Sequence, residues 1–443
     1  MPSCSRSGGL VALLLLPLVA FVTFAAAAGA ACSTTSAVVP STGKSWKSYA
    51  APAVGMGQGQ GWSSIPSGAA VCAADLVRDF KVTSSGDTVP YWVTNEVKGS
   101  VDRAVVVLAG KNRDGWSYFN LMRNARNRAA ATYPDEIKRT QIAIYTPMIF
   151  TRADKAAGAA SATDAYWAGD DWASGRAAMG PSEAATGLSS FEVMDRLIDE
   201  IKAQHPAVRD IVFAGHSMSA QFVNRYSAMK TSPDDGVRVS YWIGNPGSWL
   251  WMETQRPVAG SGKCAGYDKY KYGLSDSIPA YARQHYRSSG ERSGALQRLL
   301  QRNVHVRVGA RDFGPGDVRC QAKLQGANHR ERGTNYKNSI AALNGGKLPA
   351  GWNFEVVPGC SHDNECMFNG NLRTLFLGQS DAAVAPAAGA KTKTKTKAKK
   401  KNTKRSRADE GEQGAEDIVA EIEEGVLRRE SEVRHRRRGS AQH

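Results

Sequence analysis

Several familiar signals are missing from this chain of 443 residues, and each absence excludes a class of protein or site. The sequence holds no Asn-x-Ser or Asn-x-Thr acceptor for N-glycosylation. Metal-ligating residues do not form paired sets: Cys360, His362 and Cys366 lie close together, but no second pair accompanies them. We therefore expect neither a metal site nor a cofactor.

A concentrated basic patch of the kind that binds nucleic acid is also missing from the first 381 residues. The formal net charge is +16, and residues 382–443 hold 16 Lys and Arg against 10 Asp and Glu, a net +6. The remaining +10 is spread over residues 1–381, which indicates a generally basic surface. We expect no specific nucleic-acid partner.

What is present is the composition of a globular protein. Hydrophobic residues make up 42% of the chain, with 10 Trp, 14 Tyr and 12 Phe, so there is ample material for a core. The length suits one large domain or two or three ordinary ones.

Residues 1–31 have the features of a targeting segment. An unbroken apolar or small run covers residues 10–31, long enough to span a bilayer. Pro17 and the small residues Ala28-Gly29-Ala30 favour a cleaved signal peptide. We expect a secreted or secretory-pathway protein; the alternative is a membrane anchor formed by residues 10–31.

The cysteine count fits that compartment. After the targeting segment six cysteines remain: Cys32, Cys72, Cys264, Cys320, Cys360 and Cys366. An even set behind a secretory signal predicts two or three disulfide bonds. Six cysteines allow 15 pairings, so their connectivity stays open.

Two segments differ from the globular part. Residues 32–70, rich in Ser, Gly, Thr, Pro and Ala, predict a linker. Residues 379–443 predict a low-complexity basic tail with a short helix near 416–435, because residues 391–407 carry ten Lys and Arg and no acid. We expect a solvated, disordered tail; the alternative is contact with an anionic polymer or a membrane.

Between residues 71 and 378, short apolar runs alternate with helix-compatible stretches. We expect strands at 80–83, 90–97, 104–108, 141–146, 211–214, 237–243, 304–308 and 354–357, and helices at 116–130, 188–204, 294–301 and 364–377. This alternation predicts an α/β fold with a doubly wound, mostly parallel sheet. In such a sheet the functional residues gather beyond the carboxyl ends of the strands.

One of these strand ends carries a reactive hydroxyl. The apolar run 211–214 stops at Gly215, Ser217 follows, and a helical stretch begins. A strand, a sharp turn and a helix with a serine at the apex are typical of a nucleophile elbow, in which the flanking positions must be small. Ser219 stands where glycine is usual. The alternative is a plain glycine turn into a helix.

A nucleophilic serine needs a base, and the base needs an orienting acid. After such an elbow the chain order is serine, acid, histidine. His362 follows the last expected strand and Asp312 follows the strand before it. Asp317 is the alternative acid. We expect a structural role for His216, and no special role for His329, which we place in a polar loop.

Two backbone amides must stabilise the negative charge that develops on the substrate oxygen. We expect one from Met218, directly after the serine. The other should come from the loop after the strand 104–108, where Lys111 is favoured and Asn112 is the second choice.

Residues 71–378 resemble the α/β-hydrolase superfamily, and within it a poorly characterised secreted or membrane-associated branch. The resemblance rests on the segments 188–197, 214–226, 245–250, 320–333 and 358–363. It implies the α/β-hydrolase fold and a catalytic triad of Ser217, Asp312 and His362. It implies no substrate, because this fold supports many chemistries.

Residues 246–295 form a long insert between two expected strands. The insert contains seven aromatic residues: Trp249, Trp251, Tyr267, Tyr270, Tyr272, Tyr281 and Tyr286. They predict either packing at the surface or a cap over the site, whose aromatic wall would suit an acyl chain, an aromatic ester or a sugar.

These features predict a secreted serine hydrolase that cleaves a small carboxylic ester with an acyl or aromatic group. One alternative is a non-catalytic binding protein built on the same scaffold. The other is a peptidase or acyltransferase that uses the same triad.

Overall fold

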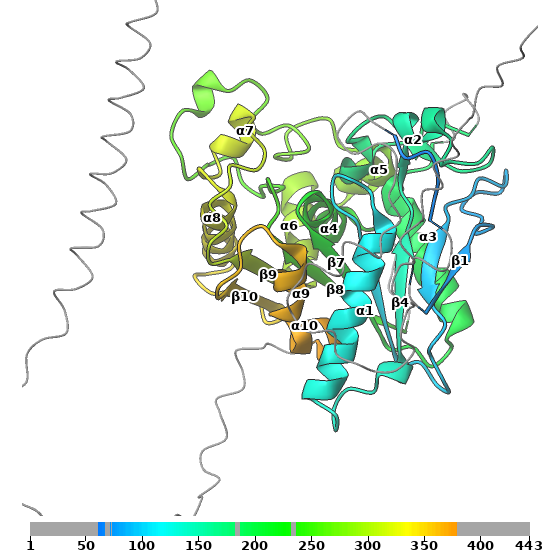
Figure 1. Ribbon diagram of the computed structural model, residues 1–443. Helices are drawn as coiled ribbons and strands as arrows, with labels where there is room; N and C mark the ends of the chain where they lie inside the picture. Colours follow the sequence, from blue (N-terminus) through cyan, green and yellow to red (C-terminus); the bar gives the residue numbers. More distant parts are fainter. Residues whose placement is uncertain (1–60, 67–70, 72, 182–186, 232–235, 379–443) are drawn as a thin grey trace, which may run out of the picture. The chain divides into compact units, whose positions relative to one another are not determined.

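The computed structural model describes residues 61–66, 71, 73–181, 187–231 and 236–378 (Figure 1). The targeting segment, most of the linker and the basic tail lie outside the described residues, together with Cys32 and Cys72. The chain divides into two compact units, 1–385 and 386–443, and the second lies entirely outside the description.

A mixed sheet forms the centre of the first unit. Its eight strands are β1 (Ala74–Val77), β2 (Tyr91–Thr94), β3 (Arg103–Leu108), β4 (Ile142–Pro147), β7 (Asp210–His216), β8 (Arg238–Gly244), β9 (Asn303–Gly309) and β10 (Trp352–Val357). They lie in the order β1-β2-β4-β3-β7-β8-β9-β10. Only β1–β2 and β2–β4 pair antiparallel; all other pairs are parallel. The carboxyl ends of β3 and β7 to β10 therefore share one edge.

Helices connect and cover these strands. They are α1 (Gly115–Thr132), α2 (Arg152–Ala157), α3 (Ser190–Gln204), α4 (Met218–Met229), α5 (Ala280–Ser288), α6 (Glu291–Leu300), α7 (Cys320–Lys323), α8 (His329–Leu343), α9 (Asn364–Asn369) and α10 (Leu372–Leu377). The remaining elements of the described residues are short. They are the 3-10 turns η3 (Arg139–Gln141), η4 (Asp171–Ser174) and η5 (Ser261–Lys263), and a two-stranded ribbon of β5 (Phe150–Thr151) and β6 (Tyr166–Trp167).

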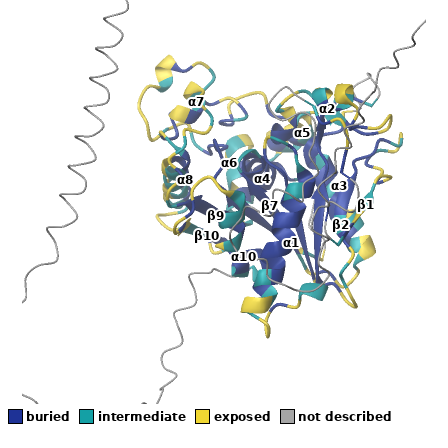
Figure 2. Ribbon diagram, viewed as in Figure 1, coloured by how far each residue is buried: buried dark blue, intermediate teal, exposed yellow. Residues whose placement is uncertain are grey.

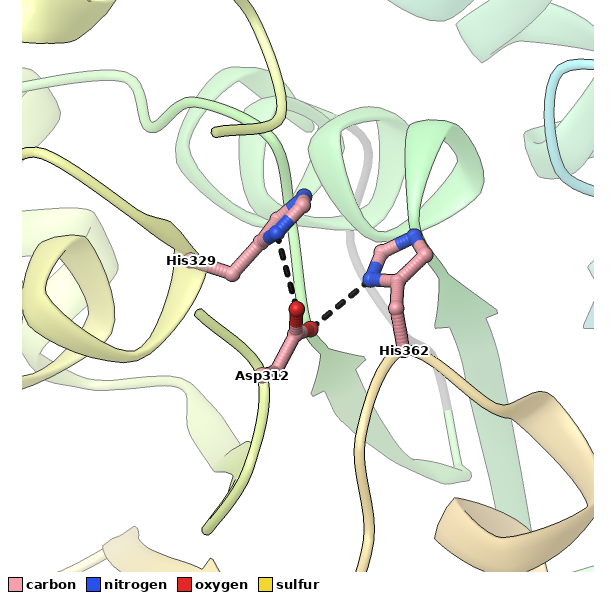
Figure 3. A group of neighbouring side chains, drawn as sticks. All are labelled: Asp312, His329 and His362. Atoms are coloured by element: carbon pink, nitrogen blue, oxygen red, sulfur yellow. Dashed lines mark hydrogen bonds and ion pairs between the residues drawn. The ribbon is translucent and has the colours of Figure 1, made fainter. Parts of the chain in front are cut away.

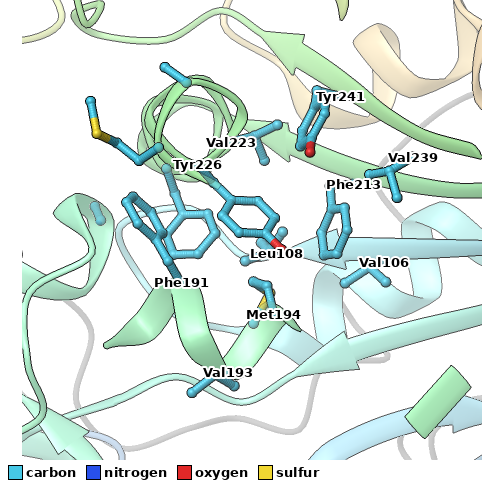
Figure 4. Packing of buried hydrophobic residues seen from close by; sticks show 14 of the residues in the cluster. Val106, Leu108, Phe191, Val193, Met194, Phe213, Val223, Tyr226, Val239 and Tyr241 are labelled. Atoms are coloured by element: carbon cyan, nitrogen blue, oxygen red, sulfur yellow. The ribbon is translucent and has the colours of Figure 1, made fainter. Parts of the chain in front are cut away.

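The apolar strands are buried on both faces. In β3, Val106 and Leu108 join the core that α3 and α4 cover, whereas Val105 and Val107 join the core under α1, α9 and α10. This follows from the alternation of side chains along a strand. Figure 2 shows the central strands as buried, and Figure 4 shows the first core, where the ring of Tyr226 packs between those of Phe191 and Phe213. The structure confirms the predicted doubly wound α/β fold.

Two expected elements differ. The strand at 80–83 is wrong: β1 pairs with β2 instead, and only Lys81 forms an isolated bridge, because the chain turns between Thr83 and Asp87. The last helix is broken into α9 and α10. Gly370 follows α9 and packs closely against β10, because a Cβ there would lie 2.5 Å from the side chain of Val357.

Candidate active site

Ser217 lies in a strained turn between β7 and α4. Its backbone has φ +64° and ψ −119°. Residues with a side chain rarely adopt such a conformation, which costs about 1–3 kcal/mol. The amide of Ser217 donates to the carbonyl of Gly244 at 2.9 Å, which holds the turn against the end of β8. The serine therefore stands at the apex of the turn, between the strand and the helix.

The neighbours of this serine explain why the turn is so tight. A Cβ on Gly215 would lie 2.3 Å from the backbone oxygen of Ser219, so no side chain fits there. The Ser219 hydroxyl is fully buried and accepts a hydrogen bond from the His216 amide at 3.0 Å. It reaches the carbonyls of Leu108 at 2.8 Å and His216 at 3.0 Å as a donor. The serine in place of glycine thus ties the turn to the end of β3.

Three side chains from the ends of three strands form one chain of contacts, which runs from Ser217 through His362 to Asp312. The Nε2 atom of His362 lies 2.9 Å from Oγ of Ser217. The Nδ1 atom of the same ring lies 2.7 Å from Oδ2 of Asp312. When Nδ1–H donates a hydrogen bond to the carboxylate, Nε2 presents a lone pair to the serine hydroxyl, as a proton acceptor must.

Backbone contacts join the loops that carry Asp312 and His362. The Arg311 amide donates to the Cys360 carbonyl at 2.8 Å, and the Ala310 amide donates to the Val357 carbonyl at 3.0 Å. A Cβ on Gly309 would lie 2.6 Å from the Cys360 oxygen, so this glycine allows the two loops to approach. The spacing between acid and histidine is therefore set by the backbone.

Asn245, which the sequence showed only as the end of a strand, strengthens this junction. Its side chain is buried; Oδ1 accepts from the Gly309 amide at 2.7 Å, and Nδ2 donates to the Ser361 carbonyl at 3.1 Å. It thereby links β9 to the residue before His362.

Asp317, the alternative acid, does not face His362. Its carboxylate accepts from the Tyr272 hydroxyl at 2.6 Å and lies 3.4 Å from the guanidinium of Arg319. Of the two candidates, Asp312 is the one placed against the histidine.

His329 contradicts the expectation of an ordinary loop residue. It is buried and begins α8. Its Nδ1 lies 3.0 Å from Oδ1 of Asp312, although the two atoms are not aligned as a good hydrogen bond. Its ring stacks on His362, with centroids 4.2 Å apart and planes 25° apart (Figure 3). The capping pattern of Asn328 and Glu331 was the available signal for this helix start.

The charges of the site follow from these contacts. Burial raises the pKa of Asp312, but the contacts with His329 and His362 outweigh it and hold the pKa well below its usual range. Burial, with the nearby His362 as a second cause, holds the pKa of His216 well below normal. At neutral pH Asp312 is therefore a carboxylate and His216 a neutral ring, 4.7 Å from His362 between centroids.

The two residues expected to supply amide donors, Lys111 and Met218, line the same cavity as Ser217. Among the described residues, neither backbone N–H has a hydrogen-bond partner. Gly110 makes room for the loop of Lys111, because a Cβ there would lie 2.7 Å from the Tyr118 hydroxyl.

The cavity has a volume of about 1000 Å³ and two chemically different walls. The apolar wall consists of Trp62, Trp116, Tyr118 and Leu121. The basic wall consists of Arg225, Lys271 and Arg319. A molecule bound here can therefore bury an apolar part and place a polar part near positive charge.

The aromatic residues of the insert 246–295 do not line this cavity. Trp249, Trp251, Tyr270, Tyr272 and Tyr286 are buried in the protein instead. Within the insert only Gly247 and Lys271 reach the cavity. The insert therefore supplies no aromatic wall to this cavity; the aromatic surface comes from residues before and within α1.

One cluster of metal-ligating type occurs among the described residues, formed by Asp312, His329 and His362. Both imidazoles turn Nδ1 toward the carboxylate, and that of His362 is at hydrogen-bonding distance. Because the hydrogen bond of His362 suits a protonated Nδ1, which has no lone pair for a metal ion, we assign the cluster no metal.

Two disulfide bonds occur in the described part of the chain, Cys264–Cys320 and Cys360–Cys366. Disulfides suggest an extracellular or secretory compartment. None of the described helices combines the length and apolar character needed to cross a membrane.

No protein-family model and no curated protein matches the sequence. Among solved structures, the chain is similar to LpqC, a poly(3-hydroxybutyrate) depolymerase from Bordetella parapertussis, at 19% identity and a TM-score of 0.49, over 70% of this chain and 92% of that one. It is also similar to poly(aspartic acid) hydrolase-1 from Sphingomonas sp. KT-1, at 19% identity and a TM-score of 0.44, over 67% and 95%. Likenesses this distant bring no substrate or reaction to the present chain.

The fold itself is defined by this chain's own topology. The strand order, the helices on both faces and the serine turn after β7 are those of the α/β-hydrolase fold. The resemblance in the sequence is thereby confirmed at the level of the fold.

Proposed function

We propose that this protein is a serine hydrolase that cleaves a carboxylic ester through an acyl-enzyme on Ser217. The observation that carries the proposal is the chain of contacts from Ser217 Oγ to His362 Nε2 at 2.9 Å and from His362 Nδ1 to Asp312 Oδ2 at 2.7 Å. These are the positions of a nucleophile, its base and the acid that orients the base.

In the first half of the reaction, Ser217 Oγ attacks the ester carbonyl carbon while His362 Nε2 takes the hydroxyl proton. The C–O bond to the alcohol breaks, and His362 returns the proton to the departing oxygen. Water then attacks the acyl-enzyme by the same exchange and releases the acid and free Ser217. Asp312 stays ionised and stabilises the imidazolium that forms in both halves.

The negative charge on the carbonyl oxygen needs donors that are already in place. The amides of Lys111 and Met218 suit this role, because both line the cavity beside Ser217 and are not used within the described structure. Losing one such donor typically costs about 2.7–4 kcal/mol in the transition state.

Two alternative functions are a non-catalytic binding protein and a peptidase or acyltransferase, and different observations bear on each. A separation too long for proton transfer would have favoured a non-catalytic binding protein, and the 2.9 Å contact gives that reading no support. A peptidase or an acyltransferase uses the same three residues, so only the rates on esters, amides and acyl acceptors separate them from an esterase.

The test is labelling by a fluorophosphonate probe, which reacts with an activated serine hydroxyl. We expect the wild type to label at Ser217, Ser217→Ala to remain unlabelled, and His362→Ala to label far more slowly. Circular dichroism should show that all three are folded.

A matched control is available in the same cavity. Ser117 also lines it, but no base contacts its hydroxyl among the described residues. Ser117→Ala should label like the wild type. The proposal fails if the folded wild type does not label, or if Ser217→Ala labels as well as the wild type.

A further inference from the structure

The basic wall begins on the helix that carries the nucleophile. Arg225 lies two turns along α4 from Ser217 and is completely buried. Its guanidinium donates to the carbonyls of Ala173 at 2.7 Å and Lys271 at 3.4 Å, and to the side-chain oxygen of Gln221 at 2.9 Å. Within the described structure no carboxylate lies within 4 Å of it. Its hydrogen bonds are satisfied, but its charge has no direct counter-ion, and burying such a charge is costly.

Lys271 brings a second positive charge to the same place. Lys271 lines the cavity, and its ammonium group makes no hydrogen bond or ion pair with the rest of the described chain. Burial, reinforced by Arg225 and Arg319, lowers the pKa of Lys271 to about 8. Burial and the like charges nearby therefore raise the free energy of the charged ammonium group, and a bound anion would lower it.

The acidic groups near this wall do not fully offset it. Asp317 is held by Tyr272 and by Arg319, its partner at 3.4 Å. Asp170 also lines the cavity and acts on Lys271 at longer range. The three cations of the basic wall, set against Asp170 and Asp317, leave one positive charge in excess there.

We infer that Lys271 and Arg225 form a subsite for a carboxylate group of the substrate. The inference rests on the proposed function and names its substrate class: an ester with an anionic carboxylate at one end. The two charges recognise it together, Lys271 by direct contact and Arg225 through the field of its buried guanidinium. A single excess charge suits a singly charged carboxylate better than a doubly charged phosphate.

The position of Arg225 limits how long the substrate is. Eight residues of α4 separate it from Ser217, a rise of about 12 Å at about 1.5 Å per residue. The carboxylate should therefore lie within about 12 Å of the ester carbonyl, while the apolar wall takes the other part of the molecule.

The test compares two p-nitrophenyl esters of the same chain length, one ending in a carboxylate and the other in the neutral primary amide, across a series of chain lengths. We expect the full-length wild type to prefer the carboxylate by about tenfold in kcat/KM at the best length, the value of one charge-assisted contact. Lys271→Met should lose most of this preference, measured as the ratio of kcat/KM on the two esters.

Two further variants separate charge at the site from charge in general. Lys271→Arg should retain the preference, because the guanidinium keeps the charge. Lys269→Met removes an exposed charge two residues away, which pairs with Asp276 at 3.2 Å and does not line the cavity. It should behave like the wild type. Equal preference in Lys271→Met and the wild type, or no preference in the wild type, overturns the subsite.

Failure of the subsite is distinguishable from failure of the proposed function. A wild type that labels at Ser217 and hydrolyses both esters equally refutes only the subsite. For a readout without turnover, calorimetry should show the free dicarboxylate binding to Ser217→Ala and binding about tenfold more weakly once Lys271→Met is added. Equal binding by both proteins also overturns the inference.

Discussion

Single atoms around Ser217 decide whether the turn can form and whether its hydroxyl has a base. Ser219 illustrates this at a position where glycine is usual: its one hydroxyl serves the amide of His216 and the carbonyl of Leu108. The end of β3 and the turn after β7 are thereby joined. Because the loop of Lys111 leaves the same end of β3, this hydroxyl also helps to place one of the two proposed amide donors.

His329 has the most direct effect on the acid. It lies 3.0 Å from Asp312 and helps to hold the pKa of that carboxyl low. A carboxyl whose pKa is lower in the folded state stabilises the protein above its unfolded pKa of about 3.9, and this contribution is lost as the pH falls toward the folded value. His329→Gln should bring the folded pKa of Asp312 closer to the unfolded one and make this loss smaller.

Urea unfolding at a series of pH values below about 4 measures this effect, as the slope of the unfolding free energy against pH. We expect a shallower slope in His329→Gln than in the wild type. Phosphonate labelling should persist in the variant, because Ser217, His362 and Asp312 all remain. An unchanged acid slope would show that His329 does not stabilise the carboxylate.

At the scale of elements, the two disulfides hold different parts of the site. Cys360–Cys366 closes a short loop that contains His362, with a sequence separation of 6. Cys264–Cys320 has a separation of 56 and joins the insert to the region of Arg319. Loop-closure entropy predicts a loss of about 2 kcal/mol for opening the short loop and about 4 kcal/mol for the long one.

Activity should respond in the opposite order. Replacing Cys360 and Cys366 by alanine frees the loop that positions the base. The kcat on a neutral ester should therefore fall strongly, although the loss of unfolding free energy is the smaller of the two. Replacing Cys264 and Cys320 should lower the unfolding free energy more and change kcat on that ester less. Urea unfolding and initial rates, measured where both variants are folded, check this crossed pattern. A larger kcat loss in the second variant contradicts it.

Most of the sheet could be predicted because its strands are short apolar runs that stop at Gly, Pro or Asn. The helices α3 and α4 also carry clear apolar faces. The helix α8 could not be predicted from periodicity, because only Tyr336 and Ile340 are buried apolar side chains along it. Its packing depends on Gly333, where a Cβ would lie 2.3 Å from Val308, a contact that no local pattern reveals.

The same limit applies to the site. Ser217, Asp312 and His362 could be placed at strand ends, because parallel strands bring their carboxyl ends to one edge. The sequence did not reveal that His329 contacts Asp312 and His362, or that Asn245 joins the end of β9 to the residue before His362. Those contacts depend on where α8 begins and on how β8 and β9 end, which only the folded chain brings together.

At the scale of the whole molecule, the net charge of +16 adds a long-range attraction for an anionic substrate to the local contact with Lys271. This attraction is screened as the Debye length falls from about 30 Å at 0.01 M salt to about 8 Å at 0.15 M. We therefore expect kcat/KM for the carboxylate ester to fall severalfold over this range, while the value for the amide ester stays constant.

The two sources of attraction can be separated by deleting residues 382–443, which lowers the net charge from +16 to +10. The truncated chain should show a weaker salt dependence on the carboxylate ester but the same preference for it at high salt, where mainly the local contact with Lys271 remains. Lys271→Met should show the reverse: it keeps most of the salt dependence and loses the preference at high salt. If truncation removed the preference at high salt, the tail would be the source of the selectivity and the cavity would not be.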